Sequence, residues 1–237
     1  MDLKKIIKES DMILVGIGES FQEKFHSIKV GEDKRITVSE EYERKKYIDN
    51  LEKDDIIEAY NVLAKLLDGK NYFVVTLCDD DKIFKSEIRE DRIVAPCGTY
   101  NKLQCENVCS EEIYSVEDYK KELEDNQQLL CPKCGAKLVM NRISNRKYSE
   151  EGYIQKWNLY MKWLQGTVNR DICILELGVG MKYPSVIRWP FEKISFINQK
   201  AKFIRVHDYL YQLTEDLKEK GISIQENPCV FLTNQIV

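Results

Sequence analysis

Four cysteines in two short pairs constrain the fold of this chain more than any other feature. Cys105 and Cys109 belong to a CENVC segment, and Cys131 and Cys134 follow after 21 residues in CPKCG. Thiolates bind zinc tetrahedrally, and two close pairs joined by a loop supply four ligands, while Pro and Gly beside the second pair favour a tight turn. The spacing therefore predicts a structural zinc module. The alternatives are four reduced cysteines in a core, or two disulfides in a secreted protein.

Length and charge fit one main domain that carries a small module. The chain has 237 residues, which is long for one domain and short for two. Its net charge of −4, with Lys and Arg interspersed, argues against a nucleic-acid partner, including a zinc-ribbon reader. The N-terminal segment does not resemble a secretory signal, and no apolar run approaches the roughly 20 residues that span a bilayer. We therefore expect a cytoplasmic protein without a membrane partner.

Short apolar runs alternate with helical patterns along the rest of the chain. The predicted strands are residues 12–15, 72–76, 92–95, 173–177 and 203–206, and the predicted helices are residues 3–8, 40–67, 152–164 and 209–220. This alternation predicts an α/β fold, a doubly wound (Rossmann-like) parallel sheet with a small four-cysteine zinc-binding module. We expect the sheet domain in residues 1–98 and 140–237, with the zinc-binding module, residues 99–139, inserted in it.

Glycine turns follow two of the predicted strands. Gly16, Gly18 and Ser20 come straight after the first strand, and Gly178 and Gly180 follow a later one. Glycines let backbone N–H groups approach a pyrophosphate, so the two turns together favour a dinucleotide site at the carboxyl edge of the sheet. For the second pair of glycines the alternative is close packing of a helix on a strand.

The order of these features resembles that of the sirtuins. It runs GxGxS, a strand ending in T-x-x-x-D, an x-G-x-Y segment, four cysteines, and a strand ending in a glycine-rich turn. The segments LELGVGMKYPSVIRWPFEKI and CGTYNKLQC are similar to those of the macrodomain-linked bacterial branch. The resemblance covers about residues 10–208. It implies an NAD-binding domain with a zinc ribbon, and NAD as a reactant whose nicotinamide leaves.

The resemblance also implies a set of site residues and partners. The positions matched to NAD binding are Gly16, Gly18, Ser20, Thr76, Gly178, Gly180 and Asn198. Asn198 would lie near the adenine-side ribose, and its alternative is an ordinary turn residue. The matched catalytic positions are Cys97, Cys78 and Asp80. The implied partners are a protein substrate or partner, among them a lipoyl-carrier protein and a macrodomain protein.

Two positions depart from the family's reaction site. Cys97 stands where a deacylating sirtuin has its histidine base and the macrodomain-linked branch has glutamine, and Cys78 stands where the family has the asparagine beside the nicotinamide ribose. A thiol with a reference pKa near 8.5 is mostly protonated at neutral pH and lacks the paired donor and acceptor of an amide. Residues 21–35 also lack the family's proline-acidic-aromatic-arginine stretch that closes over NAD.

Two functions are compatible with this pattern. The first is an NAD-dependent protein ADP-ribosyltransferase, or an acyl-lysine deacylase, that releases nicotinamide. The second is a catalytically degenerate sirtuin fold that binds NAD, ADP-ribose or a partner protein without turnover. A further hypothesis joins Cys78 and Cys97 in a reversible disulfide, which needs Cα atoms about 4.4–6.8 Å apart, or in a second metal site. Its alternative is two small residues that fill an abandoned pocket.

Overall fold

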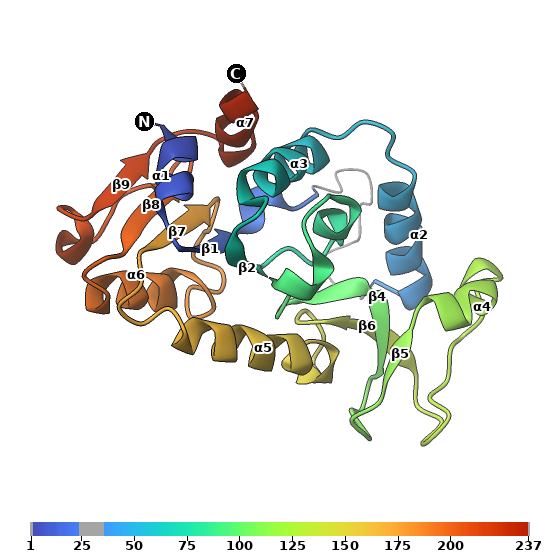
Figure 1. Cartoon of the computed structure of the whole chain (residues 1–237). Coiled ribbons are helices and arrows are strands. Elements are labelled where there is room, and N and C mark those ends of the chain that lie inside the picture. Colours follow the sequence, from blue (N-terminus) through green and yellow to red (C-terminus); the bar gives the residue numbers. More distant parts are fainter. Residues whose placement is uncertain (1, 24–35, 237) are drawn as a thin grey trace.

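A six-stranded parallel sheet forms the centre of the computed structural model, which describes residues 2–23 and 36–236 (Figure 1). Its strands are β1 (Met12–Ile17), β2 (Asn71–Thr76), β3 (Ile93–Val94), β7 (Ile172–Leu177), β8 (Lys202–Val206) and β9 (Gly221–Ile224). Their spatial order is β3-β2-β1-β7-β8-β9, and every neighbouring pair is parallel. The strand order reverses between β1 and β7, and such a switch point is where a doubly wound sheet binds its ligand.

Helices cover both faces of this sheet (Figure 1). The helices on one face are α1 (Leu3–Glu9), α3 (Asp55–Leu67) and α7 (Pro228–Thr233), and those on the other are α5 (Ile154–Gln165) and α6 (Arg188–Ile197). Alternate strand residues enter two separate cores, so Val15 packs in the core that contains Leu63 and Leu14 in the core that contains Phe191. Burial on both faces explains why the strands are apolar throughout. The predicted α/β doubly wound fold is confirmed.

A second, three-stranded antiparallel sheet forms the small unit. Its order is β5-β4-β6, from β4 (Gly98–Cys105), β5 (Ile113–Ser115) and β6 (Leu138–Arg142). Two helices, α2 (Val38–Asp49) and α4 (Lys120–Glu124), complete it. Tyr42 and Ile48 of α2 share a core with Leu103 of β4. The small unit therefore draws on a helix from the segment that was expected to belong to the large domain.

The single helix expected over residues 40–67 is two helices. Helix α3 begins at Asp55 because the Asp54 side chain accepts hydrogen bonds from the backbone N–H groups of Ile56 and Ile57, both at 2.9 Å. The remaining short turns are 3-10 helices at Glu19–Phe21, Lys82–Lys85, Glu90–Arg92, Glu117–Tyr119, Glu150–Gly152, Glu215–Leu217 and Asn234–Ile236.

The helix expected over residues 209–220 is wrong. The chain there is irregular, with one 3-10 helix at Glu215–Leu217 and a turn over residues 218–220, and it leads into the edge strand β9. The carbonyl oxygen of Leu210 accepts a hydrogen bond from Arg188, and that of Gln212 accepts one from Arg205, each at 2.8 Å. These side-chain partners replace the bonds that the backbone would make within a helix.

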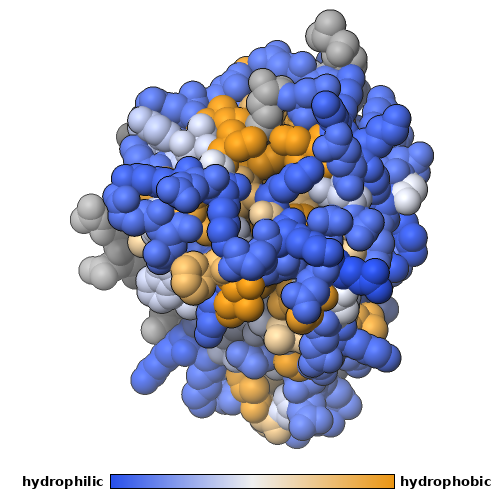
Figure 2. Space-filling model, turned by 60° about the vertical axis from the view of Figure 1, so that its left-hand side comes forward, coloured by the Kyte–Doolittle hydropathy of each residue, from blue (hydrophilic) through white to orange (hydrophobic). Residues whose placement is uncertain are grey.

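The face of the molecule that is drawn in Figure 2 is largely hydrophilic. Figure 2 shows a face on which apolar areas are separated by hydrophilic residues. Within the described parts of the chain, none of the helices is both long and apolar enough to cross a bilayer.

Candidate functional site

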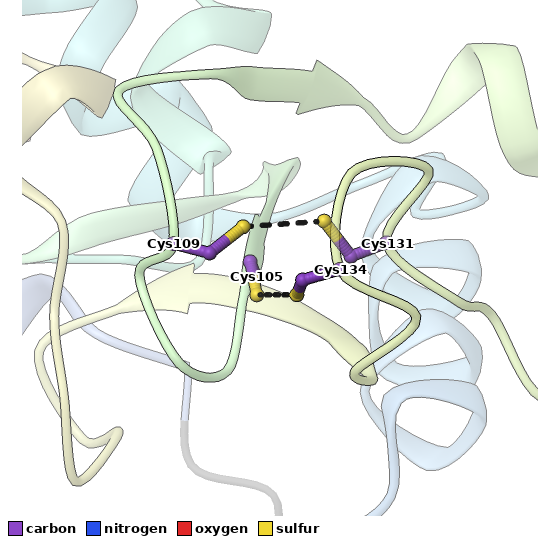
Figure 3. A group of neighbouring side chains, drawn as sticks. All are labelled: Cys105, Cys109, Cys131 and Cys134. Carbon is purple, nitrogen blue, oxygen red and sulfur yellow. Dashed lines mark hydrogen bonds between the residues drawn. The ribbon is translucent and has the colours of Figure 1, made fainter.

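The four predicted zinc ligands lie together beside the small sheet (Figure 3). Their Sγ atoms are all within 4.8 Å of one another, with Cys105 3.5 Å from Cys134 and Cys109 3.6 Å from Cys131. Zn–S bonds of about 2.3 Å place tetrahedral sulfurs about 3.8 Å apart, so the four thiols fit one zinc ion. All four cysteines are free, and Cys109 and Cys134 are exposed. The structure therefore shows neither two disulfides nor four buried thiols.

Backbone amides favour the thiolate form of Cys131. Although burial opposes ionisation, hydrogen bonds from the backbone N–H groups of Lys133 and Cys134 lower the pKa of Cys131 to about 6. The turn closes at Gly135, where φ is +72° and the N–H donates to the carbonyl of Cys131 at 2.9 Å. Four protein ligands leave no open coordination position. A zinc ion held here would fix the structure of the small unit and would take no part in a reaction.

The two glycine turns meet at the crevice between β1 and β7. The N–H of Gly18 donates to the carbonyl of Leu177 at 2.9 Å, and that of Ser20 donates to the carbonyl of Gly178 at 3.3 Å. A Cβ atom on Gly18 would lie 2.2 Å from the Gly178 carbonyl oxygen. One on Gly178, whose φ is +62°, would lie 2.5 Å from Cβ of Ser20. Both positions require glycine because the turns pack directly on each other.

The remaining glycines of the two turns have different surroundings. A Cβ atom on Gly16 would lie 2.5 Å from Ile187 and 2.8 Å from Phe191, so this glycine serves the packing of α6 on β1. The N–H of Gly180 donates to Oε2 of Glu19 at 2.7 Å. Of the predicted cofactor residues, the structure brings Gly18, Ser20, Gly178 and Gly180 into one place.

Cys78 is buried beneath the first glycine turn. Its thiol donates to the carbonyl of Gly18 at 3.2 Å, and its N–H donates to Oγ1 of Thr76 at 3.1 Å. Burial, together with the negative charge of Asp80, raises the pKa of the Cys78 thiol well above its ordinary value. Cys78 is therefore a neutral donor at physiological pH. Thr76, which is fully buried, positions the Cys78 backbone at the end of β2.

Asp80 follows the same strand and is held by two backbone amides. Its carboxylate accepts from the N–H of Glu23 at 2.6 Å and from that of Lys82 at 3.2 Å. Burial, partly offset by these two hydrogen bonds, raises the pKa of Asp80 to about 6. The side chain is thus a buried negative charge near neutral pH, fixed at the carboxyl edge of the sheet.

Cys97 lies on the opposite side of the sheet from Cys78. It packs with Phe73 and Val94, whereas Cys78 packs in the core that contains Tyr60. Burial, reinforced by the charge of Asp79, raises the pKa of Cys97 to about 12. A general base must be deprotonated near the operating pH, so this thiol cannot replace the family's histidine. Both thiols are free, and they enter different cores.

The structure does not bring Asn198 to the glycine turns. The residue ends α6, which runs from the carboxyl edge of the sheet back to the amino edge. Its amide donates to the carbonyls of Thr167 and Arg170, both at 3.1 Å, in the turn that precedes β7. Asn198 is therefore a buried structural residue of that turn.

Two residues at the carboxyl edge lacked a recognisable sequence pattern. His207 follows β8, and its Nδ1 accepts from the N–H groups of Tyr209 and Leu210 at 3.0 and 3.2 Å, so Nε2 carries the proton. Burial lowers the pKa of His207. Arg188 donates to the carbonyls of Val179 and Leu210, both at 2.8 Å. It ties together the loops that follow β7 and β8. The other histidine, His26, and the segment 24–35 lie outside the described residues.

Comparison with solved structures defines the class of fold. No family model matches the chain. A sirtuin solved to explain sirtuin substrate affinity has a TM-score of 0.65 at 17% identity, over 100% of this chain and 98% of that one. Sir2Tm bound to a propionylated peptide has a TM-score of 0.59 at 16% identity, over 99% and 97% of the two chains. The chain has the sirtuin fold.

Two named proteins are similar to this chain in sequence. A Staphylococcus aureus protein named protein ADP-ribosyltransferase is 20% identical over 275 aligned residues, which cover 99% of this chain and 86% of the relative. A Fusarium oxysporum protein named probable bifunctional ADP-ribose hydrolase/ADP-ribosyltransferase is 26% identical over 154 residues. That match covers 58% of this chain and 26% of the Fusarium protein, so the chain spans about a quarter of this relative.

Proposed function

We propose that this chain transfers ADP-ribose from NAD to a protein and releases nicotinamide. The proposal rests on one observation. The chain has the sirtuin fold, but the residues at two reaction positions, Cys78 and Cys97, are neutral buried thiols. A sirtuin deacylase needs a base at the second position, whereas departure of nicotinamide depends on positioning and electrostatics. The likeness over nearly the whole chain to a protein named ADP-ribosyltransferase supports transfer over deacylation.

Transfer of ADP-ribose from NAD needs neither an oxidant nor a base at position 97. The bond between the nicotinamide nitrogen and C1′ of the ribose breaks, a bond from the acceptor to C1′ forms, and the acceptor loses its proton to water. Positive charge develops on the ribose as neutral nicotinamide departs. Above its pKa of about 6, Asp80 supplies a buried negative charge at this edge that favours such a state.

A second candidate is a module that binds ADP-ribose or NAD without turnover. Its support is that Cys78 and Cys97, the two positions that depart from the family's reaction site, are both neutral buried thiols. The lack of a base at Cys97 fits both candidates. Turnover alone separates them.

We place the acceptor protein in a groove of about 1200 Å³ on the small unit. The groove lies between α2, the small sheet and the loop after β6, and the exposed side chains of Lys137, Arg146 and Lys147 line it. Arg142 also lines the groove, and it contacts Asp79 in the loop after β2. These three exposed cations outnumber the one exposed carboxylate of the groove, that of Glu106, so the groove suits an acidic segment of an acceptor protein.

The finer assignments rest on the family resemblance. They are a lipoyl-carrier protein as the acceptor and a macrodomain protein as a partner. The name of the Fusarium relative, which joins an ADP-ribose hydrolase to a transferase, supports a partner that removes ADP-ribose. Eight free cysteines fit a reducing compartment such as the cytoplasm.

The test is nicotinamide release by the zinc-loaded chain. The protein is incubated with NAD and candidate acceptor proteins, and mass spectrometry follows free nicotinamide and the mass of each acceptor. The proposal expects both to rise together, and Asp80→Ala to lower both while exposed Asp216→Asn changes neither. Saturable ADP-ribose binding without nicotinamide release would favour the binding module. Absence of both would leave only a protein scaffold.

A further inference from the structure

Glu19 places a carboxylate inside the glycine turns. The residue stands between Gly18 and Ser20, at the start of the 3-10 turn that follows β1. Its Oε2 accepts the Gly180 N–H at 2.7 Å, and the same oxygen would lie 3.0 Å from a Cβ atom added to Gly180. The carboxylate therefore sits directly against the backbone of the second turn.

The other carboxylate oxygen has no partner. Oε1 of Glu19 is buried and accepts no hydrogen bond. The nearby guanidinium of Arg188 is directed elsewhere, to the carbonyls of Val179 and Leu210 and to Glu176. Among residues 2–23 and 36–236, no ion pair to Glu19 is formed. A buried carboxylate oxygen without a hydrogen-bond donor destabilises the fold. Such an oxygen therefore indicates that a ligand, or a movement of the side chain, relieves this cost.

The Gly180 amide is the kind of group that binds a phosphate oxygen. In dinucleotide sites, backbone N–H groups of such turns donate to the pyrophosphate. In this chain the N–H groups of Gly18, Ser20 and Gly178 already donate to backbone carbonyls, of which those of Leu177 and Val206 belong to strands. The Gly180 N–H instead donates to a side chain, which can turn away without unfolding the sheet.

We propose that Glu19 occupies the anion site of the glycine turns, and that a pyrophosphate ligand binds only when the Glu19 carboxylate leaves the Gly180 amide. The inference rests on the proposed function, because it concerns the same nucleotide site. Glu19 is then a residue that determines specificity. The displaced carboxylate stays beside the ligand and opposes each further negative charge. The site favours a pyrophosphate diester such as ADP-ribose over a ligand that carries an additional phosphate.

The structure allows one competing role for Glu19, that of a clamp. In that role its hydrogen bond to Gly180 holds the two turns together for the ligand. The two roles predict opposite signs, because removing an occupant strengthens ADP-ribose binding and removing a clamp weakens it.

Calorimetry on the full zinc-loaded chain distinguishes these roles. The variants are Glu19→Ala, Glu19→Gln and Glu219→Ala. Glu219 is an exposed glutamate just before β9, so Glu219→Ala is a control that makes the same change in charge as Glu19→Ala. The ligands are ADP-ribose, ADP-ribose with a 2′-phosphate, and adenosine, which lacks the pyrophosphate. Thermal melts establish that each variant is folded. Glutamine keeps an oxygen for the Gly180 amide, so Glu19→Gln preserves the test even where alanine fails to fold.

Glu19→Ala is expected to bind ADP-ribose about tenfold tighter than the parent chain, with adenosine affinity changed less than about twofold. Glu19→Gln should gain a smaller factor, and Glu219→Ala less than about twofold. The parent chain should bind ADP-ribose more tightly than ADP-ribose with a 2′-phosphate, and the ratio of the two affinities should be smaller in Glu19→Ala. Equal or weaker ADP-ribose binding by both Glu19 variants overturns this inference and leaves the proposed function standing. Failure of every variant to bind ADP-ribose overturns both.

Discussion

The Nε and Nη2 atoms of Arg142 both lie 2.8 Å from Oδ2 of Asp79, and they join the small sheet to the loop that follows β2. The same guanidinium lies 2.5 Å from Glu41 of α2 and 4.4 Å from the centre of the Tyr100 ring. The three charged side chains are each only about one-tenth exposed. One cation therefore neutralises two buried carboxylates from different parts of the chain.

Replacing Arg142 by methionine should lower the free energy of unfolding by about 3–5 kcal/mol, because it leaves Asp79 and Glu41 buried without their cation. Chemical denaturation at neutral pH measures the change. Arg146→Met, an exposed residue of the adjoining loop, is the matched control and should change stability by less than about 0.5 kcal/mol. Equal stability of the two variants would show that the buried network contributes little.

The four-cysteine cluster should hold one zinc ion per chain. Cys131→Ser should lose most of the metal, because three thiolates no longer complete the tetrahedron. Cys229→Ser, at a partly buried thiol of α7, should keep it. Atomic absorption gives the zinc content, and circular dichroism should show the small core melting first in the chelated protein. Full zinc retention by Cys131→Ser would argue against the cluster as the binding site.

Gly18→Ala should destabilise the fold by about 1–3 kcal/mol and weaken ADP-ribose binding. The added Cβ would lie 2.2 Å from the Gly178 carbonyl oxygen, a backbone atom that a rotamer change cannot move. In Gly166→Ala, the control, the added Cβ meets only the Trp163 carbonyl, at 3.1 Å. Thermal melts and calorimetry on both variants measure these effects. A Gly18→Ala protein with unchanged stability would mean that the two turns are not in contact.

The burial of Asp80 should appear as a pH dependence of stability. Its pKa of about 6 in the folded chain lies above the ordinary 3.8, so its charge opposes folding. That penalty is absent well below pH 3.8, where the group is protonated in both states; it grows between about pH 4 and pH 6 and is constant at higher pH. The gap between the two values corresponds to about 3 kcal/mol. The free energy of unfolding of Asp80→Asn, measured by urea denaturation, should therefore rise relative to that of the parent by up to this amount between about pH 4 and pH 7. A difference in unfolding free energy that does not change with pH would contradict the burial of Asp80.

Cys97 should be dispensable for ADP-ribosyl transfer. Because its pKa is raised to about 12, the thiol stays neutral at physiological pH and cannot accept a proton from the substrate. We expect Cys97→Ser to keep transfer within about twofold of the parent rate, measured as nicotinamide release. A loss of a hundredfold or more in a folded Cys97→Ser protein would assign the thiol a chemical role.

The sequence was sufficient where local patterns determine the structure. The cysteine spacing identified four thiols that the fold brings together, and the apolar runs identified the strands of the main sheet except β9. Gly18 and Gly178 were recognised because each lies in a glycine turn that directly follows a predicted buried strand. These features depend on neighbours in the chain, so they can be read before the fold is known.

Other features depend on contacts that no local pattern reveals. Asn198 was placed at the nucleotide site from its order in the chain, but α6 carries it to the opposite edge of the sheet. The expected helix over residues 209–220 failed because Arg188 and Arg205 bind its carbonyls from elsewhere in the fold. The role of Glu19 could not be predicted either, since its partner Gly180 lies 161 positions away.

The small unit is built from two separate excursions of the chain, one through α2 and one from β4 to β6. Recombination that exchanged the second excursion alone would leave Tyr42 and Ile48 without the core on which they pack. An exchange of the small sheet that is to keep its core intact therefore has to carry α2 with it.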